Sequence, residues 1–151
     1  MKIETKFFGA VEIDDTQIVD FAHGIPGFEN ERKFAVLKHD DSPFHVLQSV
    51  ERSGLAFILI ELGKVAPDYE IDLPDEVVAE LKLEKPEEAL VCAIVVLPAN
   101  ISQATANLAA PIVINIKEKR GVQIILNNPA YGVKHPLFSQ VREESKLKSA
   151  K

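Results

Sequence analysis

The stretch Leu90-Val91-Cys92-Ala93-Ile94-Val95-Val96-Leu97 is the longest apolar run of the chain. It is rich in β-branched residues, which lose side-chain freedom in a helix and are favoured in strands. A second run, Leu55-Ala56-Phe57-Ile58-Leu59-Ile60, has the same character. A strand that is apolar at nearly every position is typical of one that is covered on both faces. We therefore expect two central, doubly covered strands, with a short buried helix as the alternative.

Shorter segments with alternating apolar residues surround these runs, and period-two patterns bounded by Gly, Pro, Asn and Asp predict strands. They cover residues 3–7, 11–13, 18–21, 34–37 and 44–50. The clearest hairpin spans Ile112 to Leu126, with a turn at residues 117–121 in which Gly121 is available for a positive φ. Asn115 and Gln123 lie on the polar faces of this hairpin, where we expect them to be solvated or to pair across the ladder.

One segment has the signature of a helix. Leu73-Pro74-Asp75-Glu76 is a typical helix entry, followed by Val77, Val78 and Leu81 at helical spacing and closed by Lys85-Pro86. The sequence thus predicts a mainly β fold, a single-domain barrel-like antiparallel sheet with one short helix. We expect this domain to span residues 1–141, with a polar C-terminal tail at residues 142–151.

Charge and composition limit the function. The net charge of -6 opposes direct binding of nucleic acid, whose phosphates are bound by Lys and Arg, but it permits a basic protein partner. The N-terminus has no signal-peptide pattern and no run is long enough to span a bilayer, so we expect a cytoplasmic protein without membrane contact. Cys92 is the only cysteine, and its apolar neighbours predict a buried, inert thiol.

The segment Gly24-Ile25-Pro26-Gly27-Phe28 has the most specific local pattern. Pro26 followed by Gly27 is typical of a type II turn, which needs a positive φ at the glycine. Gly24 lets the backbone pass close to another group. The segment is either a rigid turn at the rim of a barrel or, together with Phe44 and Leu47, part of an apolar contact with a partner.

Catalytic and metal-binding patterns are missing from the sequence. His39, Asp40, Asp41 and His45 form the only cluster with metal-ligand chemistry, and their spacing is not that of a zinc site. No nucleophile is paired with a base in any known signature. We expect no metal, no cofactor and no enzymatic activity. A metal-dependent hydrolase built on His39, Asp40 and His45 stays as an alternative.

The segment from Glu61 to Glu88 is strongly acidic. An extended chain would place Asp68, Glu70 and Asp72 on one side, because Tyr69 and Ile71 alternate with them. Such a run is either a solvated face or a concentration of negative charge that steers a basic partner. On the second interpretation the contact residues are Asp68, Tyr69, Glu70, Asp72, Asp75 and Glu76.

An ordered set of motifs resembles the FliW family of flagellar assembly factors and covers nearly the whole chain. The hallmark is Phe21-Ala22-His23-Gly24-Ile25-Pro26-Gly27-Phe28-Glu29, near the start. Further matches follow in the family's order: Phe34 to Leu37, Pro43-Phe44, Leu47 to Ser49, Asp68-Tyr69, Asn107 to Ile112, Ile114-Asn115, Gln123 to Leu126, Tyr131 and His135 to Leu137.

This resemblance implies a compact β-barrel-like domain with two protein partners. One is flagellin, for which the protein would act as a chaperone in the cytoplasm. The other is the RNA-binding translational regulator CsrA. Binding to CsrA would relieve its repression of flagellin translation, and accumulated flagellin would reverse this by occupying the factor. The alternative from another class is a small β-barrel nucleic-acid-binding domain, which the fold allows and the charge opposes.

Overall fold

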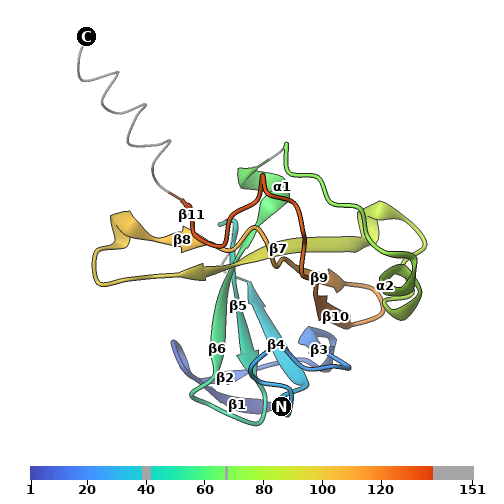
Figure 1. Ribbon diagram of the computed structural model, residues 1–151. Helices are drawn as coiled ribbons and strands as arrows, with labels where there is room; N and C mark the ends of the chain where they lie inside the picture. Colours follow the sequence, from blue (N-terminus) through green and yellow to red (C-terminus); the bar gives the residue numbers. More distant parts are fainter. Residues whose placement is uncertain (39–41, 67, 138–151) are drawn as a thin grey trace.

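The computed structural model describes residues 1–38, 42–66 and 68–137. Seven strands form a closed barrel in the order β9, β7, β6, β5, β4, β3 and β10, and β10 returns to β9 (Figure 1). Their bounds are β3 Ile18–Asp20, β4 Lys33–Lys38, β5 Phe44–Ser49, β6 Ala56–Glu61, β7 Ala89–Val96, β9 Ile112–Asn115 and β10 Arg120–Gln123. All neighbours are antiparallel except β3 and β10, which are parallel. The predicted mainly β, barrel-like fold is confirmed.

Strand β7 closes the barrel because it is long enough to pair with several partners. Its first half, Ala89 to Cys92, pairs with β9, and the overlapping stretch Cys92 to Val95 pairs with β6. Its last residues pair with the short strand β8 (Thr105–Ala106), which extends the sheet beyond the barrel to β11 (His135–Pro136). The apolar run from Leu90 to Leu97 is therefore the central strand that the sequence predicts.

The barrel interior holds the main core. Phe21, Phe34, Leu47, Leu59 and Ile112 are fully buried there, and the rings of Phe21 and Phe34 meet edge to face with centroids 5.5 Å apart. Burial of such side chains contributes roughly 1.5–3 kcal/mol each. This cluster occupies the inner faces of both predicted central strands.

A second cluster covers the outer faces of the same strands. Ile60 and Ala93 pack there with Leu62 of the short helix α1 (Leu62–Val65) and with Tyr69 and Tyr131. β6 and the part of β7 that lies in the barrel are therefore covered on both faces, as predicted, whereas Val96 at the end of β7 and the following Leu97 are exposed. This covering explains why both strands are apolar at nearly every position.

The N-terminal residues form a separate hairpin of β1 (Lys2–Thr5) and β2 (Gly9–Glu12). Ile3 and Ile13 pack against Ala35 on the outer side of β4. The Gln48 side chain ties the hairpin to β5 by accepting a hydrogen bond of 2.9 Å from the Lys6 N–H. The remaining short elements are the 3₁₀ turns η1 (Asp15–Gln17), η2 (Pro86–Glu88) and η3 (Ile101–Gln103).

The predicted helix exists but is shorter than expected, and it is not the only one. α2 spans Asp75–Glu80 and ends before Lys82, whose φ of 55° stops the helix well ahead of Lys85-Pro86. The buried Asn115 side chain stabilises this end by donating to the carbonyl of Leu81 at 2.7 Å. Asn115 is thus neither solvated nor paired across its ladder, because a distant helix supplies its partner. The prediction of a single helix is also corrected, since α1 is a second short helix.

The β9–β10 turn differs from its prediction in the residue that takes the positive φ. That residue is Lys119, with a φ of 57°. Gly121 lies within β10, and a Cβ there would stand 2.6 Å from the ring of Phe21. The glycine is required by the close approach of a buried ring, which the local turn pattern did not reveal.

The predicted boundary between domain and tail falls outside the described residues, because both residues 138–141 and the tail 142–151 do so. Within the described ranges, no helix is both long and apolar enough to cross a membrane.

Candidate partner-binding surfaces

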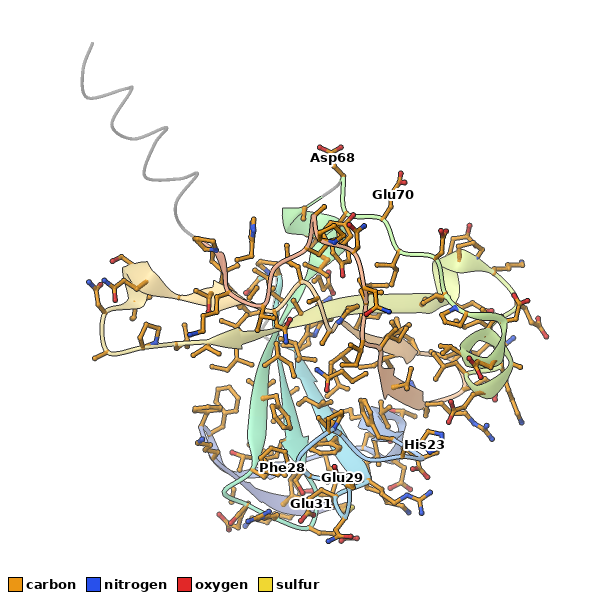
Figure 2. The ribbon with its side chains drawn as sticks, in the orientation of Figure 1. His23, Phe28, Glu29, Glu31, Asp68 and Glu70 are labelled. Carbon is orange, nitrogen blue, oxygen red and sulfur yellow. The ribbon has the colours of Figure 1, made fainter. Side chains whose placement is uncertain are left out.

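The acidic segment, residues 68–76, follows α1 along the surface and ends in the first turn of α2. Exposure alternates along it as predicted: Asp68, Glu70 and Asp72 are exposed, whereas Tyr69 and Ile71 are partly buried. Figure 2 shows the carboxylates of Asp68 and Glu70 projecting away from the barrel. The segment therefore presents its acids on one side and its apolar residues on the other.

Two tyrosines fix the acidic segment to the rest of the molecule. The Tyr69 hydroxyl donates to the carbonyl of Leu108 at 2.7 Å, and its ring lies against that of Tyr131 with centroids 4.4 Å apart. The Tyr131 hydroxyl accepts from the Glu70 N–H at 3.0 Å and donates to the Glu70 carbonyl at 3.1 Å. Burial and the neighbouring Tyr131 raise the pKa of Tyr69 to about 12. Tyr69, predicted as a contact residue, thus serves first as an anchor.

The carboxylates of the segment are available to a partner. Within residues 1–38, 42–66 and 68–137, no ion pair joins Asp68, Glu70, Asp72, Asp75 or Glu76 to a basic group. Asp75 and Glu76 occupy the first turn of α2, where the helix dipole favours negative charge. The local negative potential is therefore not neutralised by the described part of the chain.

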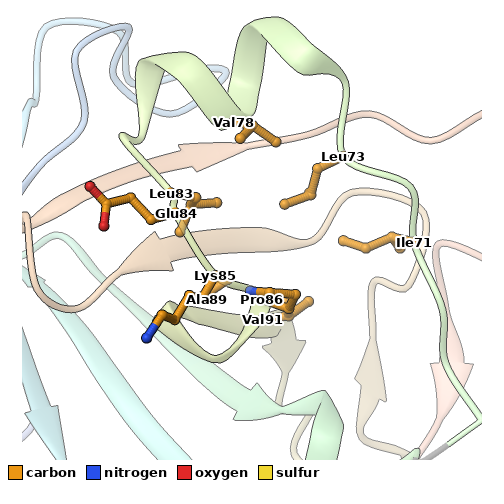
Figure 3. A pocket seen from close by; sticks show the side chains of 9 residues that line it. All are labelled: Ile71, Leu73, Val78, Leu83, Glu84, Lys85, Pro86, Ala89 and Val91. Carbon is orange, nitrogen blue, oxygen red and sulfur yellow. The ribbon is translucent and has the colours of Figure 1, made fainter.

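An apolar groove of about 360 Å³ lies between the acidic segment, α2 and the start of β7. The side chains of Ile71, Leu73, Val78 and Leu83 converge on it (Figure 3). Ile71 and Leu73 are the residues that alternate with the exposed acids, so one segment supplies both an acidic ridge and the wall of a groove. This groove was not predicted, although the alternation of Ile71 and Leu73 in the sequence was its visible signal.

The Gly24-Ile25-Pro26-Gly27-Phe28 segment forms the expected type II turn, which we call the Gly-Pro turn. Gly27 has a φ of 91°, and the Phe28 N–H donates to the Ile25 carbonyl at 2.6 Å. Gly24 has a φ of 65°, and a Cβ there would stand 2.6 Å from the backbone of Glu29. The close backbone approach expected at Gly24 is confirmed.

The Glu29 side chain completes the turn. It accepts a hydrogen bond of 3.0 Å from the Gly27 N–H. Backbone N–H groups of Gly27 and of Glu29 itself hold the pKa of this carboxyl below its usual value. The turn is thus closed from both sides by local hydrogen bonds.

The apolar residues grouped with this turn do not form one surface. Ile25 and Leu47 are 1% and 0% exposed and lie in the barrel core, and Phe28 packs edge to face on Phe57 at 5.6 Å. Phe44 belongs to the second cluster, on the outer side of β5. Pro26 and Gly27 are the exposed members of the set. Packing therefore accounts for Ile25 and Leu47.

His45 is the one residue of the predicted metal cluster that the structure describes, since His39, Asp40 and Asp41 lie outside the described residues. It is buried, and its Nε2 lies 2.6 Å from the Glu61 carboxylate. Burial opposes ionisation of Glu61, but His45 and Lys64 outweigh it and leave the pKa of Glu61 below its usual value. In the described ranges, no group of three or more His, Cys, Asp or Glu side chains is placed to hold a metal ion.

Cys92 is buried in the barrel, as its apolar neighbours predict. Burial, with a smaller contribution from the Glu61 charge, raises the pKa of its thiol to about 12. The thiolate that a nucleophilic cysteine needs is therefore strongly disfavoured here.

With both surfaces in view, comparison with known proteins identifies the family. The FliW protein family model matches residues 2–137 of the chain. The chain belongs to the FliW family. The flagellar assembly factor FliW of Caldicellulosiruptor bescii is 40% identical over 142 residues, which cover 94% of this chain and 93% of the relative. That of Anoxybacillus flavithermus is 42% identical over 143 residues, which cover 95% of this chain and 99% of the relative.

A solved structure of a FliW protein has the same fold. The crystal structure of the flagellar assembly factor FliW superposes with a TM-score of 0.85 at 42% sequence identity, covering 91% of this chain and 96% of the other. The FliW resemblance seen in the motifs is thereby confirmed over the barrel as well as over the sequence. These FliW relatives are named as assembly factors of the flagellum.

Proposed function

We propose that this FliW family member binds flagellin in the cytoplasm as a chaperone and also binds the translational regulator CsrA, relieving its repression of flagellin translation. Membership of the family supports the flagellar role. The observation that carries the CsrA contact is the row of exposed carboxylates at Asp68, Glu70 and Asp72, which form no ion pair among the described residues. An RNA-binding regulator must attract phosphate, so it offers basic groups to such a row.

The groove next to the ridge makes the surface more specific than charge alone. A partner strip with apolar side chains flanked by Lys or Arg would fit Ile71, Leu73 and Val78 while its cations meet Glu70 and Asp72. Apolar contacts at the centre of an interface with charges at its rim are the usual arrangement of protein complexes. The charges would then set the association rate and the groove the lifetime of the complex.

The test is a titration of purified CsrA and purified flagellin, separately, against the parent chain and a Glu70→Lys/Asp72→Lys variant at low and high salt. We expect CsrA binding to weaken with salt, because exposed charges are screened within about 10 Å at 0.1 M, and to weaken further in the variant. The control variant is Glu4→Lys/Glu51→Lys, which makes the same charge change at exposed positions on β1 and after β5. An equal loss of CsrA affinity in both variants would show that the net charge of the chain, and not the acidic segment, determines binding.

A second variant tests the groove. Val78 lines the groove, whereas its neighbour Val77 packs in the cluster under α2. Val78→Lys should therefore fill the groove without removing a core side chain, and CsrA affinity should fall. Flagellin binding that persists in both variants would place its site elsewhere. Absence of binding to either partner by the parent chain would overturn the proposed function.

A further inference from the structure

One end of the barrel interior is hollow. A cavity of about 320 Å³ opens there, with walls from β3 (Val19), β4 (Val36), β5 (His45), β7 (Leu90) and β9 (Ile114). Val19 and Ile114 belong to the main core cluster, and Val36 and Leu90 pack against it, so the cavity continues the core outwards. Mouths of β-barrels are frequent sites for small ligands, and this volume lies at the lower end of the roughly 300–1,000 Å³ of such sites.

The described lining of this cavity carries two lysines and one glutamate, whereas the whole chain is acidic. Lys38 and Lys119 line it, and among the described residues neither has an ion pair. Glu61 is the acidic residue of the described lining. Its carboxylate already contacts His45 at 2.6 Å and Lys64 at 3.1 Å. A chain of net charge -6 therefore places two lysines that form no ion pair among the described residues at the mouth of its barrel.

The backbone of Lys119 is held in an unfavourable conformation at this position. Its φ of 57° lies in the left-handed region, where Gly or Asn is favoured and other residues are strained. Strained residues of this kind gather at ligand sites, where the side chain has a use that glycine cannot serve. Here the residue with the positive φ is a lysine that lines the cavity.

His45, one residue of the cavity wall, also carries a buried polar atom that the described residues do not satisfy. Nδ1 of His45 is buried without a hydrogen-bond partner among them. The side chain is only 5% exposed, and its other ring nitrogen is occupied by Glu61. Such atoms are rare in folded proteins and call for a specific explanation.

We propose that the mouth of the barrel is a binding site for a small anion with an apolar body, of the class of aliphatic monocarboxylates. The apolar chain lies against Val36, Leu90 and Ile114, and the carboxylate lies between Lys38 and Lys119. This site is separate from the acidic segment and does not rest on the proposed partners.

The test uses sodium octanoate as probe and the amide signals of the full chain in a two-dimensional NMR titration. Saturable shifts should concentrate at residues of the cavity wall, such as Val36, Leu90 and Ile114. Octylammonium has the same apolar body with the opposite charge, and it should not produce them. Shifts that never saturate, that lie elsewhere, or that octylammonium reproduces would overturn the proposal.

Lys119→Gly separates a binding role from a structural one. Glycine accepts the positive φ without strain, so the variant should unfold at a higher temperature than the parent. Octanoate should bind the variant about threefold more weakly, because one partly exposed charge pair is lost. Lys117→Gln is the matched control, because Lys117 lies on the same turn, 69% exposed, outside the cavity lining. Unchanged affinity in Lys119→Gly, or an equal loss in the control, would contradict the proposal.

Discussion

The Gly-Pro turn and the acidic segment are both irregular stretches at the surface, yet they are held in opposite ways. The turn is fixed mainly by its backbone, through two positive φ angles and the close approach of Gly24 to Glu29, and the Glu29 side chain adds one hydrogen bond from the Gly27 N–H. The acidic segment is fixed by side chains, through Tyr69 and Tyr131, and leaves its carboxylates unpaired among the described residues. Figure 2 places the two at opposite ends of the molecule. A substitution should therefore damage the fold in the first region and the surface in the second.

The largest effect is expected from Gly24→Ala. The new Cβ would stand 2.6 Å from the Cα and the carbonyl oxygen of Glu29, and the backbone cannot yield as a flexible side chain could. The φ of 65° adds the strain of a left-handed conformation. Together we expect a loss of about 3 kcal/mol or more in the free energy of unfolding. Chemical denaturation measures this, and a loss below about 1 kcal/mol would contradict the close approach.

Gly27→Ala is the matched substitution within the same turn. Gly27 also has a positive φ, 91°, but a Cβ there would meet no atom within 4 Å. The conformational strain alone remains, so we expect a loss of about 1–2 kcal/mol. The difference between the two alanine variants then measures the contact with Glu29. Equal denaturation midpoints for the two variants would show that strain, not contact, dominates at Gly24.

Tyr69→Phe tests the anchor of the acidic segment. It removes the hydroxyl that donates to the Leu108 carbonyl and keeps the ring that lies against Tyr131. We expect the free energy of unfolding to fall by about 1 kcal/mol, the usual net value of such a bond. The Glu70 amide, which donates to Tyr131, should exchange its hydrogen faster, because the segment opens more easily. Unchanged exchange at Glu70 would mean that Tyr131 alone holds the segment.

The Gly-Pro turn and the acidic segment also show which structural features could be predicted from the sequence. The Gly-Pro turn was predicted down to the residue with positive φ, because a type II turn depends on neighbouring residues only. The strands were predicted for the same reason, since alternation and β-branching are local signals. The exposure pattern of residues 68–72 also follows from a local alternation.

The missed features depend on contacts between distant residues. Tyr131 reaches Glu70 across 61 positions, and Asn115 reaches Leu81 across 34. Gly121 is set by the ring of Phe21, and the groove beside the acidic segment requires α2 to lie over the start of β7. No local pattern encodes such pairings, so the sequence predicted Tyr69 as a partner contact and gave Tyr131 as a motif residue, but it did not predict that the two rings meet.

The double substitution in the acidic segment is expected to have the smallest effect on stability and the largest effect on CsrA binding. Glu70 and Asp72 are exposed and, among the described residues, make no ion pair, so Glu70→Lys/Asp72→Lys should change the free energy of unfolding by no more than about 0.5 kcal/mol. Glu70 contributes to the fold through its backbone, which bonds to Tyr131 and is kept in the variant. If the segment steers a basic partner, the association rate should fall more than the dissociation rate rises. Thermal unfolding and stopped-flow binding to CsrA measure the two quantities on one sample. If the variant is folded and associates with CsrA as fast as the parent, the acidic segment is only a solvated face. If the variant is destabilised, the side chains of Glu70 and Asp72 contribute to the fold, as the glycines of the Gly-Pro turn do.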